Sequence, residues 1–194
     1  LKKIAEIKST VSGDLPNVYL MHGDFYDDEI NELMNHPKVK SHVNITHGEG
    51  FGRPLLEASV TEKPVISSNW SGHVDFLKGL GILLDGTMTA VPKKAFPKDM
   101  RVEQAQWFTV DYQKTSQIMM DVFKNYKKYT LNAKKLSIIN KSKFSLHSMT
   151  KKLGQILDEN VPEFPKEVAL QLPKLKKVGE TKNQKMKLPK LKKV

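Results

Sequence analysis

The segment "HVNITHGEGFGRPLLEASVTEKPVISS" (42–68) determines the predicted fold. A short strand pattern at 42–46 leads into a glycine-rich turn, and a helix pattern then begins at Pro54, a residue that the first turn of a helix tolerates well. A second strand pattern follows at 64–68. A strand, a helix and a strand in this order predict two parallel strands joined by a crossover helix, as in an α/β domain.

The same alternation continues on both sides of this segment. We therefore predict a Rossmann-like parallel sheet flanked by helices, with a ligand site at the carboxyl ends of the strands, where the turn at 47–52 falls. The neighbouring elements that the pattern predicts are a helix at 1–11, a buried strand at 17–25, a helix between Asp27 and Pro37, a loop at 69–73, a short helix at 74–78 and a strand at 81–85.

The second half of the chain is predicted to be mainly helical. Residues 86–106 are assigned no regular structure. After "WFTVD" (107–111), an apolar stripe predicts a long amphipathic helix, and more helix is predicted at 131–141 and 147–159. The stripe consists of Thr115, Ile118, Met119, Val122, Phe123 and Tyr126.

Composition indicates a globular domain followed by a basic tail. The chain has 194 residues, 39% of them hydrophobic and 27% charged, which is ordinary globular usage. The net charge is +11, but ten lysines and two glutamates at 165–194 supply +8 of it. We therefore divide the chain into a domain at 1–162 and a lysine-rich tail at 163–194. The tail contains "LPKLKKV" twice and is expected to be disordered.

Several function classes are excluded or disfavoured. The absence of cysteine excludes disulfides, cysteine nucleophiles and thiolate metal sites. No apolar run approaches the ~20 residues that span a bilayer and no signal-peptide pattern opens the chain, so we expect a cytoplasmic protein. Arg53 and Arg101 are the only arginines, which argues against sequence-specific nucleic-acid recognition. The tail can be a solvated appendage, a segment attracted peripherally to an anionic membrane surface, or a non-specific nucleic-acid contact.

The turn "HGEGFG" (47–52) offers main-chain N–H groups to an anion such as a phosphate. It lacks the third glycine of a dinucleotide fingerprint and the Gly-Lys-Ser/Thr of a P-loop. The flanking carboxylates of Glu49 and Glu57 can accept hydrogen bonds from sugar hydroxyls, so the whole arrangement suits a nucleotide sugar. In a second interpretation, Glu57 complements the helix dipole and Glu49 is a solvated loop residue.

The stretch "THGEGFGRPLLEASVTEKPVISSNWSGHVDFL" (46–77) resembles the donor-binding half of the glycosyltransferase group 1 family, also called family four. The hallmark of this family is two glutamates separated by seven residues within E-G-F-G-x-P-x-x-E-A, followed by G-x-P-V-I and a glycine-containing loop. The resemblance extends loosely over residues 17–160. The matching residues are Glu49, Gly50, Phe51, Gly52, Pro54, Glu57, Ala58, Pro64, Val65, Ile66 and Gly72.

The resemblance implies the C-terminal lobe of a two-lobed enzyme with the GT-B fold. Such enzymes are retaining and metal-independent, use no cofactor, and transfer a sugar from a donor such as a UDP- or GDP-sugar to a glycan, lipid or protein acceptor. It implies a catalytic role for Glu49, which contacts the donor sugar, and a ribose contact for Glu57. The remaining predicted donor-binding positions are His47, Gly48, Gly50, Phe51, Gly52, Arg53, Leu55 and Gly72.

The sequence departs from the family pattern in two respects. Glu62 and Lys63 precede Pro64 where the family usually has Gly-x-Pro, so this turn lacks its glycine. The first strand of the lobe and the whole acceptor lobe would lie upstream of Leu1. We therefore expect the chain to be the carboxyl-terminal part of a longer enzyme, or a subunit that needs a partner.

Simpler roles remain open for individual residues. Arg53 can reach a phosphate or be solvated, and His47 can touch the donor or serve as a hydrogen-bonded structural residue. The loop at 69–73 can close over the sugar, and the aromatic pair at 107–108 is expected in the core. Two other functions also remain: a nucleotide-sugar-binding module without catalysis, and a basic nucleic-acid-binding protein.

Overall fold

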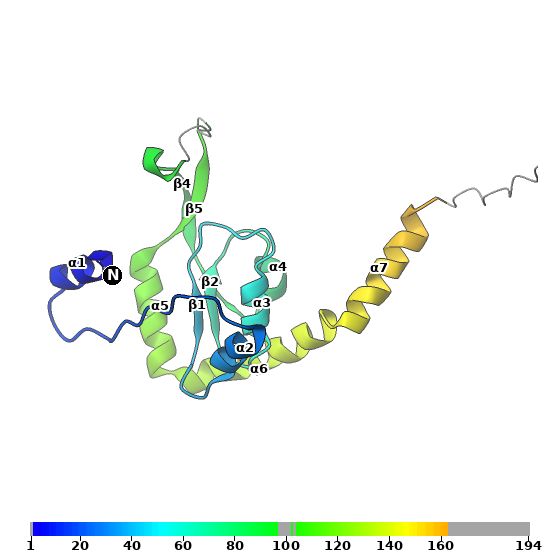
Figure 1. Cartoon of the computed structure of the whole chain (residues 1–194), viewed down its shortest axis with the longest axis horizontal. Helices are drawn as coiled ribbons and strands as arrows, with labels where there is room; N and C mark the ends of the chain where they lie inside the picture. The colour runs from blue at the N-terminus through cyan, green and yellow to red at the C-terminus, as the bar shows by residue number, and fades with distance from the viewer. Residues whose placement is uncertain (1, 97–101, 103, 163–194) are drawn as a thin grey trace, which may run out of the picture.

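The computed structural model describes residues 2–96, 102 and 104–162 (Figure 1). It shows a mixed α/β architecture in which helices flank a three-stranded parallel sheet, with an antiparallel hairpin beside it. The helices are α1 (Lys2–Thr10), α2 (Asp27–Asn35), α3 (Arg53–Ser59), α4 (Val74–Leu77), the 3₁₀ helix η1 (Lys93–Ala95), α5 (Tyr112–Lys124), α6 (Tyr126–Lys143) and α7 (Leu146–Asn160). The strands are β1 (His42–Asn44), β2 (Val65–Ser68), β3 (Ile82–Leu84), β4 (Gly86–Ala90) and β5 (Gln106–Val110).

The central sheet has the order β1-β2-β3, and both strand pairs are parallel. Strand β2 is buried along its whole length, as expected for a middle strand covered on both faces. Its successive residues face opposite sides of the sheet. Val65 joins a core cluster with α3, α4 and α6, and Ile66 joins a second cluster with β3, β5 and α5.

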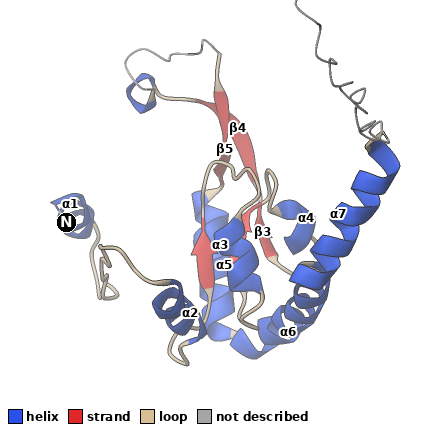
Figure 2. Ribbon diagram, turned by 45° about the vertical axis from the view of Figure 1, so that its right-hand side comes forward, coloured by secondary structure: helices blue, strands red, loops and turns tan. Residues whose placement is uncertain are grey.

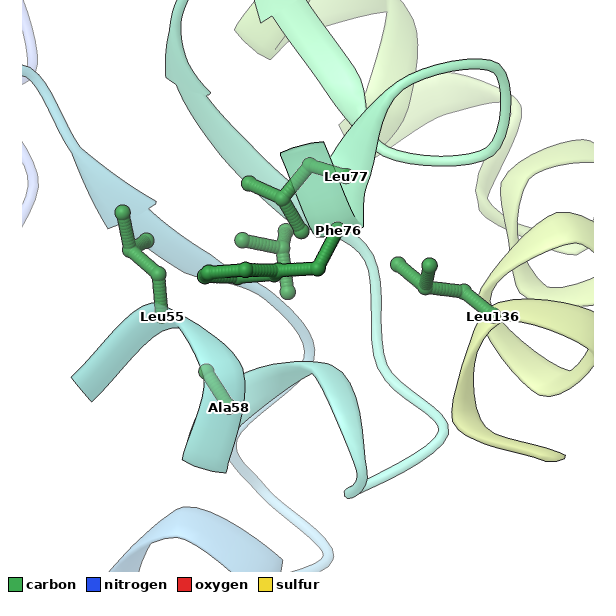
Figure 3. Packing of buried hydrophobic residues seen from close by; sticks show 6 residues of the cluster. Leu55, Ala58, Phe76, Leu77 and Leu136 are labelled. Carbon is green, nitrogen blue, oxygen red and sulfur yellow. The ribbon is translucent and has the colours of Figure 1, made fainter. Parts of the chain in front are cut away.

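Figure 3 shows the first of these clusters, in which Phe76 and Leu77 of α4 pack between α3 and α6. Leu55, Ala58 and Leu136 complete the contact, and each is no more than 3% exposed. Burying a leucine or phenylalanine side chain contributes roughly 1.5–3 kcal/mol, so this cluster is a main source of the stability of the domain. Helix α3, which follows the glycine-rich turn, is therefore anchored by its buried face.

The parallel strands and the helices predicted between residues 42 and 85 are confirmed. The helices predicted near both ends of the described chain are confirmed as well. The predicted buried strand at 17–25 is wrong. This segment forms no strand, and its apolar side chains are exposed because it pairs with no neighbouring strand. A β-strand needs a hydrogen-bonding partner, which an apolar run alone does not supply. The predicted tail at 163–194 lies outside the described residues.

The absence of regular structure predicted for 86–106 is also wrong. Strands β4 and β5 form an antiparallel hairpin in which Thr87 lies opposite Thr109 and Met88 opposite Phe108. The hydroxyls of Thr89 and Thr109 bond to each other at 2.6 Å. The alternation in "GTMTA" favours a strand, and Pro92 lies beyond its end, where proline does not interrupt the ladder.

The apolar stripe of α5 is only partly buried. Thr115 and Val122 lie in the core, whereas Met119 is 42% exposed and Phe123 is 82% exposed. The outer portion of this helix is therefore accessible to solvent in the described structure. Among the described residues, none of the helices combines the length and the apolar character that crossing a bilayer requires.

Candidate functional site

Three connections gather at the carboxyl end of the parallel sheet (Figure 2). Residues 45–52 follow β1, residues 69–73 follow β2, and the β4–β5 hairpin begins directly after β3. The carboxyl edge of a parallel sheet is where open α/β folds bind ligands. The sequence-predicted site residues at 47–53 therefore lie at the expected edge.

The first two connections are joined through Glu49 and Ser71. The Glu49 amide donates to Ser71 Oγ at 3.1 Å, and the Ser71 hydroxyl donates to the carbonyl of Glu49. The Gly72 amide donates to the same carbonyl at 3.1 Å. The backbone of Gly72 lies directly against Gly50 and Phe51. The main chain of Glu49 is thus fixed from both sides.

Gly52 occupies a position that a larger residue cannot adopt without strain. Its φ is +84°, in the left-handed region, and a Cβ at this position would lie 2.9 Å from the Cβ of His73. His73 is fully buried, and its Nε2 lies 2.6 Å from the carbonyl of Ser68 and 3.1 Å from Ser67 Oγ. A carbonyl can only accept, so Nε2 carries the proton. The glycine-rich turn therefore packs, at Gly52, against the buried side chain of His73.

His47 connects the turn to the hairpin. Its Nδ1 lies 2.6 Å from the carbonyl of Phe108, so Nδ1 carries a proton that it donates. The imidazole also stacks on Trp107, with ring centroids 3.7 Å apart and an interplanar angle of 5°. Trp70 stacks on Phe108 in turn. These contacts give His47 the structural role that the sequence left open.

The turn presents main-chain N–H groups at the start of α3. In the described part of the chain, the amides of Phe51 and Gly52 donate to no backbone carbonyl. The amides of Leu55 and Leu56 both donate to the carbonyl of Gly52, at 2.9 and 3.0 Å. The Leu55 side chain is also buried in the core. Leu55 therefore has neither its amide nor its side chain free for a donor molecule.

Arg53 and Glu57 face a polar cavity of about 520 Å³. Arg53 Nε lies 3.1 Å from Glu57 Oε1, and both side chains are substantially exposed, at 80% and 45%. Such an i,i+4 pair contributes only about 0.3–0.5 kcal/mol, so a ligand can displace it. The other residues lining the cavity are Asp27, Ile30, Asn31, Met34, Asn35, Val60, Thr61 and Lys141.

The structure does not bring all predicted site residues into one cavity. Glu49 is half-buried in the turn and is not among the residues that line the cavity of Glu57. Gly48 and Gly50 are exposed on the same turn, and Phe51 turns its ring toward Phe76 and Phe144. Gly72 belongs to the neighbouring loop. The predicted residues thus form a rim around the turn and a separate cavity on the α2 side of α3.

The cavity also contains residues that the sequence analysis missed. Asp27, Asn31 and Asn35 recur every four residues on one face of α2, opposite Arg53 and Glu57. That polar periodicity is a signal that could have identified them. Lys141 comes from α6, far away in the sequence, and no local pattern could have placed it at this cavity.

Lys63 holds α2 at the border of the cavity. Its ammonium group donates to the carbonyls of Met34 and His36, which end the helix, and the distance to the second is 2.8 Å. A cation at a helix C-terminus satisfies carbonyls that have no partner in the helix. Desolvation and then the charge of Lys63 lower the pKa of the nearby His42, and desolvation followed by the charge of Lys40 lowers the pKa of Lys63 itself.

The described residues contain no group of three or more histidine, aspartate or glutamate side chains able to hold a metal ion. No protein-family model matches this chain, and a search of curated proteins finds no relative.

Proposed function

We propose that this chain is the donor-binding part of a retaining, metal-independent glycosyltransferase that uses a nucleotide sugar. The observation that carries the proposal is the position of Glu57. Its carboxylate borders a polar cavity, next to Arg53 and one helical turn from a glycine-rich turn at the carboxyl edge of the sheet. This position supports a contact with a ligand that has hydroxyl and phosphate groups.

Each part of a nucleotide sugar has a matching group in this arrangement. Glu57 would accept hydrogen bonds from the ribose hydroxyls, and Arg53 would leave its pair with Glu57 to bind the diphosphate. The amides of Phe51 and Gly52, which have no backbone acceptor among the described residues, would bind the same phosphates. Glu49, on the other side of the turn, would contact the sugar.

Preorganised amides would also assist transfer itself. Departure of the nucleoside diphosphate develops negative charge on the leaving phosphate, and fixed N–H groups stabilise such charge without reorganising. The bonds that Ser71 and Gly72 make to Glu49 hold the turn in place for this purpose. The acceptor would bind to a second lobe, as the resemblance implies.

A second candidate function is a nucleotide-sugar-binding module that does not catalyse transfer. The separation of Glu49 from the cavity that contains Glu57 favours this alternative, because transfer requires both groups to act on one bound donor. The two candidates share the binding step and differ only in turnover.

Calorimetric titration with UDP, GDP and their sugars tests the shared binding step. We expect at least one nucleotide to bind, and we expect Glu57→Gln to weaken that binding by at least about tenfold, since ~1.4 kcal/mol corresponds to a tenfold change. The matched control is Glu159→Gln, an exposed glutamate on α7. Equal affinity in wild type and Glu57→Gln would overturn the proposed site, and the absence of any nucleotide binding would overturn both functions.

Release of the nucleoside diphosphate from the bound donor separates the two candidates. A transferase would release it in the presence of acceptor or water, with and without a chelator, and Glu49→Gln would abolish release while leaving binding within about twofold. Binding without release in the wild-type chain would favour the binding module.

A further inference from the structure

Helices α2 and α3 form two walls of the polar cavity that contains Glu57 (Figure 1). Helix α3 contributes Arg53 and Glu57, and α2 contributes Asp27, Asn31 and Asn35. The volume of about 520 Å³ is in the range of ligand pockets. The contacts proposed for the ribose and the diphosphate use the α3 wall. The α2 wall is therefore left for the remaining part of the nucleotide, which is its base.

Asp27 is the acidic residue of α2 that lines this cavity. The helix begins with three acidic residues, and the other two bond to the main chain at its start. The Tyr26 amide donates to Glu29 Oε2 at 2.9 Å, and the Glu29 amide donates to Asp28 Oδ1 at 3.0 Å. Among the described residues, the carboxylate of Asp27 has no such bond and no ion pair. It is therefore available to a ligand.

Asn31 adds a hydrogen-bond donor one helical turn further along the same wall. The Nδ2 group of Asn35 donates to the Oδ1 and to the backbone carbonyl of Asn31, both at 2.9 Å. These bonds orient the Asn31 carboxamide, and its own Nδ2 group has no acceptor within the described part of the chain. The α2 wall thus presents an acceptor at Asp27 and a donor at Asn31.

A carboxylate distinguishes the common bases by the pattern of donors on their edges. It can only accept hydrogen bonds, and it binds best to two donors that lie side by side. Guanine has such a pair in N1–H and the N2 amino group, with the acceptor O6 next to them. Uracil has a single N–H between two carbonyls, which a carboxylate repels. Adenine and cytosine have an acceptor next to the amino group.

We propose that the cavity selects guanine, with Asp27 accepting from N1–H and the N2 amino group and Asn31 donating to O6. The inference rests on the proposed function and narrows it, because the substrate is then a GDP-sugar and not a UDP-sugar. A hydrogen bond to a charged group changes affinity by a factor of ten or more, so the preference for guanine is measurable.

Calorimetric titration of the full chain with nucleoside diphosphates tests the choice of base. We expect GDP to bind at least about tenfold more tightly than UDP or ADP. Inosine diphosphate lacks only the N2 amino group of guanine, and we expect it to bind at least about fivefold more weakly than GDP. Equal affinities for GDP and UDP, or for GDP and inosine diphosphate, would overturn the inference.

Exchanging the carboxylate for a carboxamide should exchange the preferred base. Asp27→Asn keeps one acceptor and gains a donor, which matches xanthine, where a carbonyl replaces the N2 amino group of guanine. We expect Asp27→Asn to weaken GDP binding at least about tenfold and to strengthen binding of xanthosine diphosphate at least about tenfold. The matched control is Asp28→Asn, in the same turn of α2, which should change either affinity by less than about twofold.

A gain for xanthosine diphosphate cannot come from a loss of folding. Weaker GDP binding in Asp27→Asn without that gain would assign Asp27 a structural role and overturn the contact. The Glu57→Gln variant separates this inference from the proposed function. Nucleotide binding that depends on Glu57 but not on the base would overturn the guanine contact alone, whereas the absence of any nucleotide binding would overturn both.

Discussion

Gly72 approaches Gly50 so closely that a Cβ at position 72 would stand 2.0 Å from the carbonyl oxygen of Gly50. No side chain fits in that space, and the neighbouring atom is main chain that cannot rotate away. The loop after β1 and the loop after β2 are therefore in contact through their backbones. The rim of the candidate site depends on this contact.

Gly72→Ala should consequently destabilise the domain, because one loop must move away from the other. We expect a loss of at least about 2 kcal/mol in the free energy of unfolding, measured by urea denaturation, together with weaker nucleotide binding. Gly154→Ala is the control, since nothing lies within 4 Å of its hypothetical Cβ and alanine is the better helix former by about 1 kcal/mol. Similar stability in the two variants would contradict the backbone contact.

Glu62→Gly should stabilise the protein, although most glycine substitutions do the opposite. Glu62 has a φ of +63°, in the left-handed region that disfavours side chains by roughly 1–2 kcal/mol. Glycine relieves this strain but adds freedom to the unfolded chain, so we expect a net gain of about 0.5 kcal/mol in urea unfolding. Glu32→Gly, within α2, should instead lose about 1 kcal/mol, and a loss at both positions would contradict the strain.

Asn140→Ala should loosen α6 from the rest of the domain. The Asn140 side chain is buried, and its amide donates to Ser59 Oγ at 2.8 Å and to the carbonyl of Phe76 at 3.2 Å. Removing it leaves buried acceptors without a partner, which costs about 1–3 kcal/mol. Thermal unfolding measures the loss, and Asn160→Ala, an exposed position on α7, should change Tm little.

His47→Ala should release the hairpin from the glycine-rich turn. The substitution removes the bond to the Phe108 carbonyl and the ring stacked on Trp107. In a Trp70→Phe background, Trp107 is the only tryptophan, and its emission should shift to longer wavelength as water reaches the indole. His147→Ala, on the exposed face of α7, should leave the spectrum unchanged, whereas an unchanged spectrum in His47→Ala would contradict the role of His47.

Stability should fall as the pH decreases through the range where His42 titrates. Burial and then the charge of Lys63 lower its pKa below the ordinary value of 6.5, so below pH 6.5 the unfolded chain takes up the proton more readily than the folded one. The contribution of His42 to the free energy of unfolding is therefore fully present above about pH 6.5. It is lost as the pH falls toward the lowered pKa of His42. His42→Gln should flatten the dependence of Tm on pH between about 7.5 and 5.5, and an unaltered slope would contradict this assignment.

The sequence predicted those parts of the fold that depend on local pattern. Residues 42–85 combine strand periodicity, a glycine turn and a proline at the start of a helix, and each of these signals acts over a few residues. The segment 17–25 has the same apolar character, yet whether it forms a strand depends on a distant hydrogen-bonding edge. The hairpin was not predicted because β4 pairs with β5 across an intervening connection, so no pattern over a few residues indicates the pairing.

In the candidate site, too, local patterns could be predicted and contacts with distant segments could not. The turn and its two glutamates could be found from spacing, and the structure places the turn with Glu49 at the predicted edge and Glu57 in a separate cavity beside α2. The roles of His47 and Leu55 could not be found in this way. His47 is bound by a hairpin about 60 residues away, and Leu55 uses its amide within its own helix turn. Lys141 reaches the cavity only because α6 packs on α3.

The bonds from Ser71 and Gly72 to Glu49 also affect how the protein can vary. A substitution library confined to 48–52 would select against changes that shift the main chain, since the unaltered partner loop contacts that main chain directly. Libraries that randomise both loops together should recover pairs of changes that fail singly. A new specificity at this rim therefore has to be engineered by selecting changes together in the loop after β1 and the loop after β2, two segments that are distant in sequence.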